Sequence, residues 1–579
     1  MNLHMKQIRL ASRDWIGLAL VLAGFVLRLR QYLANRSLWL DEAMLANNIV
    51  NRSFAGLFQP LDNNQGAPVG FLLLQKTVTL AFGDSEYALR LLPFLAGILS
   101  LALMFALTRK VAGAFAGNLA LALFAFSPAL IYYTSEVKQY SSDVAIALAL
   151  CLLCLKYAQD NDWLALYSQR EFREFANSAN GSGKNSRHIV PVGYSYIRGI
   201  RIKTWLRNTA LLVFAGALAV WFSHPALFVL GGLGLAIFLP AVRAKDARKI
   251  VTLLLVAAAW SLSLGALYFV NLRPLASHQF FLDFWREGFL PHDLSAWRWL
   301  GLSLHAPFGD LLGLRTPYLV TAFLFLIGLV GLTRRFPRFG LFLLLVFFLT
   351  LLASFLTLYP FAGRMILFLA PALTLLLADG ADLVADLTGG ALSLSKRFIG
   401  SLIGKASRHG AGVGKQEPLR KPARSHPSRW LAWTVRVLLA GCLLFSPLSL
   451  AAENFAAPKL REHLRPTMET LRDFRKDGDL VYVYYWAGHA VRFYAPKYGF
   501  AMSDFILGAD HHDQPELYRA ELDALRGHAR VWFLFSHVYE NGGFNEREFI
   551  LDYLDSIGDL SRAYNAHGTS VFLYLYDLR

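Results

Sequence analysis

Charged residues are scarce in this chain. Lysine, arginine, aspartate and glutamate together make up 17% of its 579 residues, whereas soluble domains carry roughly 25%. Hydrophobic residues make up 55% of the chain and aromatic residues 14%. A water-soluble protein of this size could not bury so much apolar surface. The composition therefore excludes a soluble globular protein and indicates an integral membrane protein.

Cysteine is rarer still. Each of the three cysteines, Cys151, Cys154 and Cys442, lies inside an apolar run. The Cys151-x-x-Cys154 spacing is that of a redox motif, but nothing around it resembles a thioredoxin-like domain. We interpret the pair as two thiols packed on one helix. Residues 453–579 contain no cysteine, so packing alone must stabilise that part of the chain.

Acidic residues are also few relative to basic ones. The chain has 40 aspartates and glutamates against 57 lysines and arginines, a net charge of +17. In a soluble protein this excess would suggest a nucleic-acid partner. Here the positive charge lies in short loops between apolar runs, where it orients membrane proteins. We therefore expect membrane lipids as partners and no nucleic acid.

Long apolar runs, by contrast, are abundant. A helix of about 20 apolar residues crosses a bilayer, and eleven runs of roughly this length occur. The predicted spans are residues 15–33, 88–108, 114–132, 142–158, 208–223, 226–241, 250–270, 316–333, 339–358, 363–385 and 431–451. The first run is too long for a signal-peptide core and no small-residue cleavage site follows it, so we count it as a retained span.

A shorter apolar run, residues 68–82, carries Lys76. We expect it to lie along the membrane surface, with a spanning helix as the alternative. If it does not span, 29 lysines and arginines fall on one side of the membrane, against about ten on the other side before residue 453. The positive-inside rule then places the N-terminus in the cytoplasm. If the run spans, every later loop inverts and the rule fails.

The predicted organisation is a transmembrane domain over residues 1–452 and an extracytoplasmic domain over residues 453–579. In the second of these, polar helix-like stretches alternate with the strand-like runs LVYVYYW, VWFLF and VFLYLY, which indicates a small α/β domain. Two cytoplasmic stretches, 177–188 and 404–429, have the composition of flexible linkers.

Two adjacent carboxylates stand near the start of the first outer loop, residues 34–87. The sequence there reads Arg36-Ser-Leu-Trp-Leu-Asp41-Glu42-Ala. Acidic residues are favoured at a helix N-terminus by the helix dipole. They are equally suited to act as a general base, or to hold a divalent cation such as magnesium or manganese. Composition alone leaves these readings open.

A second polar cluster lies in the outer loop 133–143, between the third and fourth predicted spans. The sequence is Tyr-Tyr-Thr-Ser-Glu136-Val-Lys138-Gln-Tyr140-Ser-Ser-Asp143. Ionisable groups near a membrane interior are costly and are usually functional or paired. We interpret this cluster as part of a site, with a surface ion pair between Glu136 and Lys138 as the alternative.

The third element is Tyr359-Pro-Phe-Ala-Gly363-Arg364, which opens the tenth predicted span. A lone arginine at the end of an apolar helix can extend its guanidinium to the interface. A guanidinium is also well shaped to hold a phosphate, and Gly363 would let that phosphate approach the backbone. Arg364 is therefore a candidate phosphate ligand.

At these three places the chain resembles the GT-C superfamily of membrane glycosyltransferases. It is most similar to the group of protein O-mannosyltransferases, aminoarabinose transferases and rhizobial lipopolysaccharide transferases. The resemblance rests on LWLDEA in the first outer loop, SEVKQY in the second, EYALRLLPFLAG at 86–97 and YPFAGR before the tenth span. It covers roughly residues 10–385. It implies an α-helical polytopic membrane protein of about 11 transmembrane helices, GT-C-like, with a small C-terminal α/β domain.

The resemblance also implies a reaction. The donor would be a sugar linked to polyprenyl phosphate, and transfer would invert the anomeric carbon. Asp41 would be the catalytic base that deprotonates the acceptor hydroxyl, with Glu136 close to it. Lys138 and Arg364 would hold the donor phosphate, which gains negative charge as the glycosidic bond breaks.

One departure from the family pattern concerns the phosphate. Relatives often carry Lys-Pro or His-Lys-Pro before the 68–82 helix, whereas this chain has Gly66-Ala67-Pro68. Lys76 or Arg90 is expected to substitute for the missing contact. The remaining residues expected to support the site are Glu42, Tyr140 and Tyr359. Asp41 and Glu42 are the candidate metal ligands if a cation binds.

The outer loop 271–315 is rich in aromatic residues. Tryptophan in such a loop commonly anchors at the membrane interface, but aromatic faces also stack on sugar rings, and we expect a lid on the acceptor side. Its three histidines, His278, His292 and His305, lack the spacing of metal ligands.

The sequence thus predicts a hexosyl- or pentosyltransferase of a bacterial inner membrane, acting on the extracytoplasmic face. The acceptor is a lipid, a glycan or a protein. A lipid-linked polysaccharide ligase or polymerase is the first alternative, although such enzymes rely on arginine and histidine more than on a carboxylate after the first span. A transporter would carry its key charges near the bilayer midplane.

Overall fold

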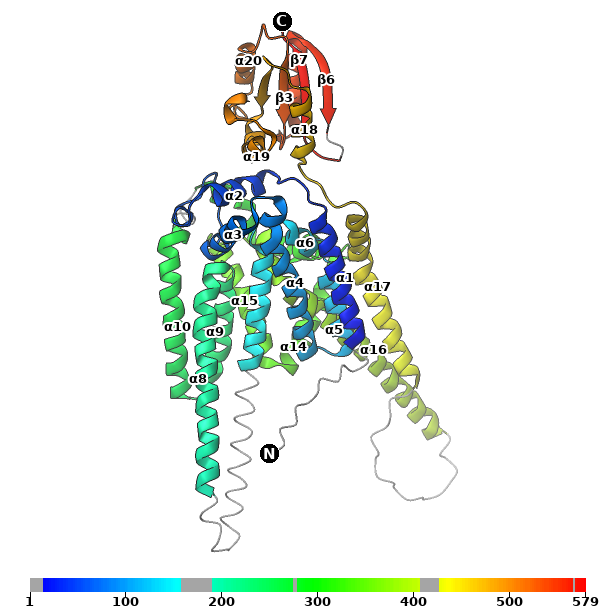
Figure 1. Ribbon diagram of the computed structural model, residues 1–579. Coiled ribbons are helices and arrows are strands. Elements are labelled where there is room, and N and C mark those ends of the chain that lie inside the picture. Colours follow the sequence, from blue (N-terminus) through cyan, green and yellow to red (C-terminus); the bar gives the residue numbers. More distant parts are fainter. Residues whose placement is uncertain (1–13, 158–189, 274–278, 407–425, 566–567) are drawn as a thin grey trace, which may run out of the picture.

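A computed structural model of the chain describes residues 14–157, 190–273, 279–406, 426–565 and 568–579. A bundle of long helices forms one part, and a small domain containing a β-sheet stands at one end of it (Figure 1). The predicted linker 177–188 lies outside the described residues, and so does most of the linker 404–429. The described ends of the second linker continue long helices.

Ten helices within the described residues are long and apolar enough to cross a membrane, and a broken pair makes an eleventh. They are α1 (Asp14–Leu33), α4 (Glu86–Val111), Tyr140–Tyr157, α8 (Val190–Phe222), α9 (Ala226–Arg243), α10 (Ala247–Leu267), α14 (Tyr318–Arg335), α15 (Pro337–Phe355), α16 (Ala370–Ala406) preceded by the turn η5 (Gly363–Leu369), and α17 (His426–Ala456). Each coincides with a predicted span, so the prediction of a polytopic helical membrane protein with about eleven spans is confirmed.

The broken pair consists of α5 (Ala114–Phe126) and α6 (Pro128–Tyr132), which meet at an angle of 54°. Ser127 lies at the break, where its hydroxyl accepts the Leu130 N–H and donates to the carbonyl of Leu311. Serine is a favoured helix cap and proline a favoured first residue, so the sequence Ser-Pro ends one helix and begins the next.

A buried arginine in the first span compensates for the end of α5. Arg28, in the last third of α1, donates hydrogen bonds to the carbonyls of Phe124 at 3.4 Å and Ala125 at 3.1 Å. The last carbonyls of a helix have no partner within the helix, and inside a bilayer no water replaces them. The guanidinium therefore satisfies backbone groups that the break exposes.

Two shorter helices lie between the bundle and the sheet domain (Figure 1): α2 (Leu40–Asn51) and α3 (Val69–Phe82). With 14 residues, α3 is shorter than the candidate spans, in agreement with the expected surface helix. It begins after Pro68 and ends at Gly83, whose positive φ of 80° suits glycine. The aromatic outer loop forms α12 (Gln279–Phe284), the turn η4 (Arg286–Gly288) and α13 (Ala296–Asp310).

The C-terminal domain has a five-stranded sheet in the order β2-β1-β3-β7-β6. The strands are β1 (Leu480–Val483), β2 (Ile506–Leu507), β3 (Val531–Phe535), β6 (Asp559–Asn565) and β7 (Phe572–Asp577). Strand β1 pairs in parallel with β2 and β3, and β7 pairs antiparallel with β3 and β6. Every residue of the central strand β3 is buried. The predicted α/β character is confirmed.

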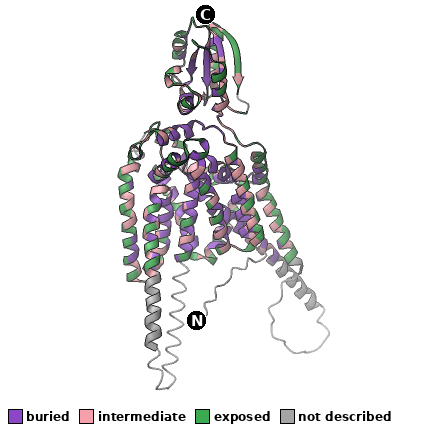
Figure 2. Ribbon diagram, viewed as in Figure 1, coloured by how far each residue is buried: buried purple, intermediate pink, exposed green. Residues whose placement is uncertain are grey.

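The helices of this domain are α18 (Leu464–Phe474), α19 (Gly488–Tyr494), α20 (Glu516–Asp523) and α21 (Glu546–Ile557). A short hairpin of β4 (Glu540–Asn541) and β5 (Phe544–Asn545) precedes α21. Buried residues of the sheet and of α19 belong to one apolar core with buried residues of α2 and α3. Figure 2 shows this burial at the end of the bundle nearest the sheet. The domain therefore packs directly on the loop that carries Asp41.

Candidate active site

The first turn of α2 carries the two acidic residues that the sequence singled out. Trp39 is in extended conformation at the N-cap position, and the helix begins at Leu40. Consecutive helical residues point about 100° apart, so Asp41 and Glu42 face different surroundings. The side chain of Asp41 is 16% exposed, whereas that of Glu42 is wholly buried.

Glu42 is held by a buried arginine. Arg90 of α4 donates to both carboxylate oxygens, from Nε at 2.9 Å and from Nη2 at 2.7 Å. The backbone N–H of Val137 donates to the same carboxylate at 2.8 Å, and the Arg36 guanidinium lies 3.7 Å away. Burial raises the pKa of Glu42, but the Arg90 and Arg36 cations outweigh it, and the net shift is downward. Glu42 is therefore an ionised carboxylate that links α2 to α4 and to the second outer loop.

Arg90 has further partners on the first outer loop. Its Nη1 donates to the carbonyl of Arg36 at 2.6 Å, and its Nη2 donates to the carbonyl of Ser37 at 3.2 Å. All three of its nitrogens are thus engaged by protein groups, and the side chain is buried. These contacts make Arg90 a buried link between α4 and the first outer loop, and phosphate binding by Arg90 stays a prediction.

Asp41 lies between two other cations. Lys138 Nζ donates to its Oδ1 at 2.8 Å, and Arg364 Nη2 lies 3.0 Å from its Oδ2. Burial raises the pKa of Asp41, but Lys138 and Arg364 more than compensate and lower it to about 2. The three residues come from three separate places in the sequence, and the fold brings them together as the resemblance implied.

Arg364 is surrounded by aromatic rings. Its guanidinium carbon lies 5.7 Å from the ring centre of Tyr140, 6.0 Å from that of Trp39 and 5.8 Å from that of Trp285. Cation–π contacts of this kind orient a guanidinium while leaving its edge available. The Tyr359 hydroxyl donates to the carbonyl of Met365 at 2.8 Å, which braces the turn that presents Arg364. Both tyrosines thus support this arginine.

Glu136 is fully buried, and none of the described residues donates a hydrogen bond to either of its oxygens. Burial and the Glu42 carboxylate raise its pKa, and the guanidinium groups of Arg36 and Arg364 oppose them without reversing the shift. The adjacent residues Val137 and Lys138 bond to Glu42 and Asp41. Glu136 is therefore part of the same electrostatic cluster, with a proton affinity higher than that of Asp41.

Sequence reasoning missed several members of the cluster. Gln65 accepts a 2.6 Å hydrogen bond from Lys138 Nζ, directly before the Gly66-Ala67-Pro68 sequence in which the family's lysine was sought. Lys76 does not take the place of that lysine, because its Nζ donates to the carbonyl of Val50 at 2.8 Å and so ties α3 to α2. A glutamine carries no charge pattern that would have identified it.

Two aromatic contacts were only partly foreseen. Trp285, in the outer loop 271–315, reaches Arg364, so the loop expected to form a lid does contribute a ring to the cluster. Arg461, which lies just before α18, is 4.3 Å from the ring centre of Trp39 and 5.2 Å from that of Tyr132. No pattern in the sequence linked the C-terminal region to this site.

The pair Asp41 and Glu42 does not fit a divalent cation. Arg90 and the backbone N–H of Val137 donate hydrogen bonds to the oxygens of Glu42. The oxygens of Asp41 form ion pairs with Lys138 and Arg364. Within the described ranges, no group of three or more histidine, cysteine, aspartate or glutamate side chains is arranged to hold a metal ion. The donors that the sequence proposed for magnesium or manganese instead form ion pairs.

Comparison with known proteins gives a partial match. The family model described as dolichyl-phosphate-mannose-protein mannosyltransferase matches residues 66–169. None of the curated proteins matches the chain. The matched stretch contains the second outer loop with Glu136 and Lys138, and the start of α4 with Arg90. The resemblance stated from the motifs is therefore supported in this part of the chain.

Solved structures similar to the chain include ArnT from Cupriavidus metallidurans bound to undecaprenyl phosphate. Its sequence identity is 13% and its TM-score 0.47, with 98% of this chain and 98% of that chain covered. The archaeal oligosaccharyltransferase AglB from Archaeoglobus fulgidus, in complex with an inhibitory peptide and a dolichol-phosphate, is also similar. Its identity is 13% and its TM-score 0.38, with 98% of this chain and 74% of that chain covered.

Proposed function

We propose that this chain is a membrane glycosyltransferase that moves a sugar from a polyprenyl-phosphate carrier to an acceptor hydroxyl. The observation that carries the proposal is the position of Asp41 between Lys138 and Arg364. A carboxylate and two cations are the groups that such a transfer needs, one to take a proton and two to hold a phosphate. The family match over residues 66–169 supports it.

The ion pairs of Asp41 change when the donor binds. The donor phosphate is an anion and competes with Asp41 for Lys138 and Arg364. The Arg364 side chain is partly exposed, and Lys138 also donates to Gln65. As these cations turn to the phosphate, the charges that depress the pKa of Asp41 are shared, and its pKa rises. Donor binding therefore converts Asp41 from an ion-pair partner into a better base.

The transfer then proceeds in one displacement. The acceptor oxygen attacks the anomeric carbon as the bond from that carbon to the phosphate oxygen breaks, and the configuration inverts. Asp41 takes the acceptor proton. The electron pair of the broken bond remains on the polyprenyl phosphate, whose increased negative charge Lys138 and Arg364 stabilise.

Glu136 is the second candidate base. A general base works best when its pKa is near the working pH, and the raised pKa of Glu136 is closer to this condition than the pKa of Asp41 in the empty site. Its complete burial opposes direct contact with an acceptor. We therefore assign proton transfer to Asp41. Glu136 is the second candidate, and it could take the proton only if the acceptor reached this buried carboxyl.

Arg90 and Glu42 act as positioning residues. Their buried contacts fix the loop before α2 and the backbone just before Lys138, so one ion pair helps to position both Asp41 and Lys138. The acceptor class stays open among lipid, glycan and protein. We further propose that the site faces the extracytoplasmic side of a bacterial inner membrane, because the basic loops gather at the opposite ends of the helices.

Release of the lipid carrier tests the proposal without knowledge of the sugar. The purified full chain is incubated with a lipid extract that contains polyprenyl-phosphate sugars, and free polyprenyl phosphate is measured by mass spectrometry. We expect the wild type to release it and Asp41→Asn to release far less. If neither protein releases it in the presence of lipid, glycan and protein acceptors, the proposal is wrong.

A further inference from the structure

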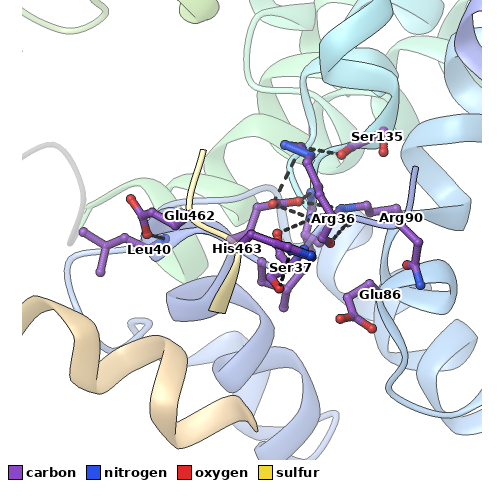
Figure 3. Close-up of polar contacts among 12 residues, drawn as sticks. Arg36, Ser37, Leu40, Glu86, Arg90, Ser135, Glu462 and His463 are labelled. Atoms are coloured by element: carbon purple, nitrogen blue, oxygen red, sulfur yellow. Dashed lines mark hydrogen bonds and ion pairs between the residues drawn. The ribbon is translucent and has the colours of Figure 1, made fainter. Parts of the chain in front are cut away.

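The chain segment that leads into α2 is held from two sides. On the bundle side, Arg90 binds the carbonyls of Arg36 and Ser37. On the other side, Glu462 and His463 of the C-terminal region form hydrogen bonds with Leu40 and Ser37 (Figure 3). Asp41 is one residue beyond this doubly held segment, so its direction depends on both sets of contacts.

The contact from the C-terminal region to the start of α2 is a helix cap. Glu462 Oε2 accepts a 2.8 Å hydrogen bond from the N–H of Leu40, the first residue of the helix. Trp39, at the cap position, offers no side-chain acceptor of its own. The first N–H groups of a helix lack intrahelical partners and are best satisfied by an anionic oxygen. Here a carboxylate more than 400 residues away in sequence supplies it.

Glu462 is itself held by the sheet domain. His537, in the loop after β3, lies with Nδ1 2.7 Å from Glu462 Oε1. The carboxylate is buried, so its position is set by two protein groups with little competition from water. A chain of contacts thus runs from the sheet through His537 and Glu462 to the first turn of α2.

Three neighbouring contacts fix the residues before Leu40. His463 Nδ1 accepts the N–H of Ser37 at 3.2 Å, and the Ser37 hydroxyl accepts the N–H of Arg465 at 3.1 Å. The Tyr494 hydroxyl accepts the N–H of Leu38 at 2.8 Å and donates to Glu86 at 2.9 Å. Three backbone N–H groups of a four-residue segment therefore end on side chains of the C-terminal region.

We propose that Glu462 is a positioning residue for the reaction, and that the C-terminal domain aims Asp41 by capping α2. The inference rests on the proposed role of Asp41 as the base. The cap acts only on the turn that carries Asp41, whereas Lys138 and Arg364 stand on other segments. Loss of the cap should therefore impair turnover while donor binding persists.

The test uses the full chain in detergent and two kinds of measurement. Hydrogen–deuterium exchange without substrate reports the N–H groups of residues 37–42, and carrier release reports kcat and the donor KM. In Glu462→Ala we expect exchange in this segment to rise and kcat to fall, each by about tenfold, with the donor KM changed less than about twofold. In Glu462→Gln an oxygen can still accept the Leu40 N–H, so both quantities should largely recover.

A matched control removes a different contact of the same domain. Lys497 forms an ion pair with Asp84 at 2.8 Å and does not touch residues 37–42, so Lys497→Ala should change neither exchange in this segment nor kcat. If Glu462→Ala does not fold, His537→Ala loosens Glu462 without altering it and should shift both quantities in the same direction by a smaller factor.

The outcomes separate this inference from the proposed function. Unchanged exchange at residues 37–42 in Glu462→Ala overturns the cap. Raised exchange with unchanged kcat overturns the positioning role, even where Asp41→Asn is inactive. Full turnover in Asp41→Asn instead overturns the proposed base, whatever the exchange data show. A kcat loss in Glu462→Gln equal to that in Glu462→Ala also contradicts the cap, because the acceptor oxygen is retained.

Discussion

The ammonium group of Lys138 lies 2.8 Å from the carboxylate of Asp41, although 97 residues separate them. One residue belongs to the outer loop after the first span and the other to the loop before the fourth. The pair links the candidate base to a candidate phosphate ligand, so neither group can change partner without releasing the other. If Asp41 is the base and Lys138 binds the donor phosphate, as we propose, donor binding and activation of the base are coupled through this contact.

Substitution of Asp41 by asparagine removes the proton acceptor and keeps the shape of the side chain. We expect carrier release by Asp41→Asn to fall by on the order of 10²–10⁴-fold, the usual cost of losing a general base. Binding of undecaprenyl phosphate should persist or strengthen, because Lys138 and Arg364 lose a competing carboxylate. Weaker binding together with normal turnover would contradict the assignment.

Arg364 should control affinity for the lipid phosphate. Loss of a hydrogen-bonded cation in Arg364→Ala should weaken binding of undecaprenyl phosphate by about tenfold or more. Arg364→Lys keeps the charge but not the two-pronged geometry, and an intermediate loss is expected. Arg286→Ala is the control, since this exposed arginine of the same outer face pairs only locally with Asp283. Equal affinity for Arg364→Ala and wild type would leave the arginine without a ligand role.

Glu42 should matter for stability more than for chemistry. Glu42→Ala leaves Arg90 charged and buried without its partner, which costs about 3–5 kcal/mol in buried ion pairs. We expect a lower thermal unfolding midpoint in detergent and less folded protein in the membrane. Undecaprenyl phosphate should still raise the thermal unfolding midpoint of the folded fraction of Glu42→Ala. A variant with normal thermal stability and no donor binding would point instead to a ligand role for Glu42.

Acid should reveal the ion pairs of Asp41. Its pKa is about 2 in the folded chain and 3.8 as an ordinary side chain. Because the folded value is the lower one, the ionised carboxylate stabilises the fold fully above about pH 4, and this contribution is lost as the pH falls to about 2. The unfolding midpoints of wild type and Asp41→Asn should therefore differ most above pH 4 and converge in stronger acid. A constant difference would show that Asp41 is not ion-paired.

Topology can be tested with reporters fused after Arg579 and within the loop between α9 and α10. We expect the first reporter to be extracytoplasmic and the second to be cytoplasmic, as the charge asymmetry requires. Four basic residues stand at this junction: Lys245 in the loop, Arg243 at the end of α9, and Arg248 and Lys249 in the first turn of α10. Opposite results for both fusions would invert the orientation and move the site to the cytoplasmic face.

The helical architecture followed from the sequence because bilayer thickness imposes one length on every span. Ten of the eleven predicted runs each coincide with one helix, and the run 114–132 coincides with the broken pair α5 and α6. The bend at Ser127 was not foreseen, since the apolar run continues through it. Hydropathy indicates which residues can lie in lipid, but it does not show where a helix axis bends.

The site was predicted less evenly. Asp41, Lys138 and Arg364 do lie together, because polar groups at the ends of spans share one membrane surface. Arg90 was expected at the phosphate, and the structure shows it buried with Glu42 as its ion-pair partner. Charge type alone cannot distinguish an arginine that binds a ligand from one that ties loops together. Glu462 was not foreseen at all, because its contact with Leu40 depends on how two regions far apart in the sequence pack together.

The bond between Arg28 and the end of α5 has a consequence for how the protein is made. Arg28 belongs to the first span, and 97 residues separate it from Ala125. A charged side chain inside an inserting helix is costly, by up to about 2.5–3.5 kcal/mol at the helix centre. The carbonyls that offset the cost of Arg28 are synthesised only after two further apolar helices have begun. We therefore expect the first span to enter lipid together with α5 rather than ahead of it.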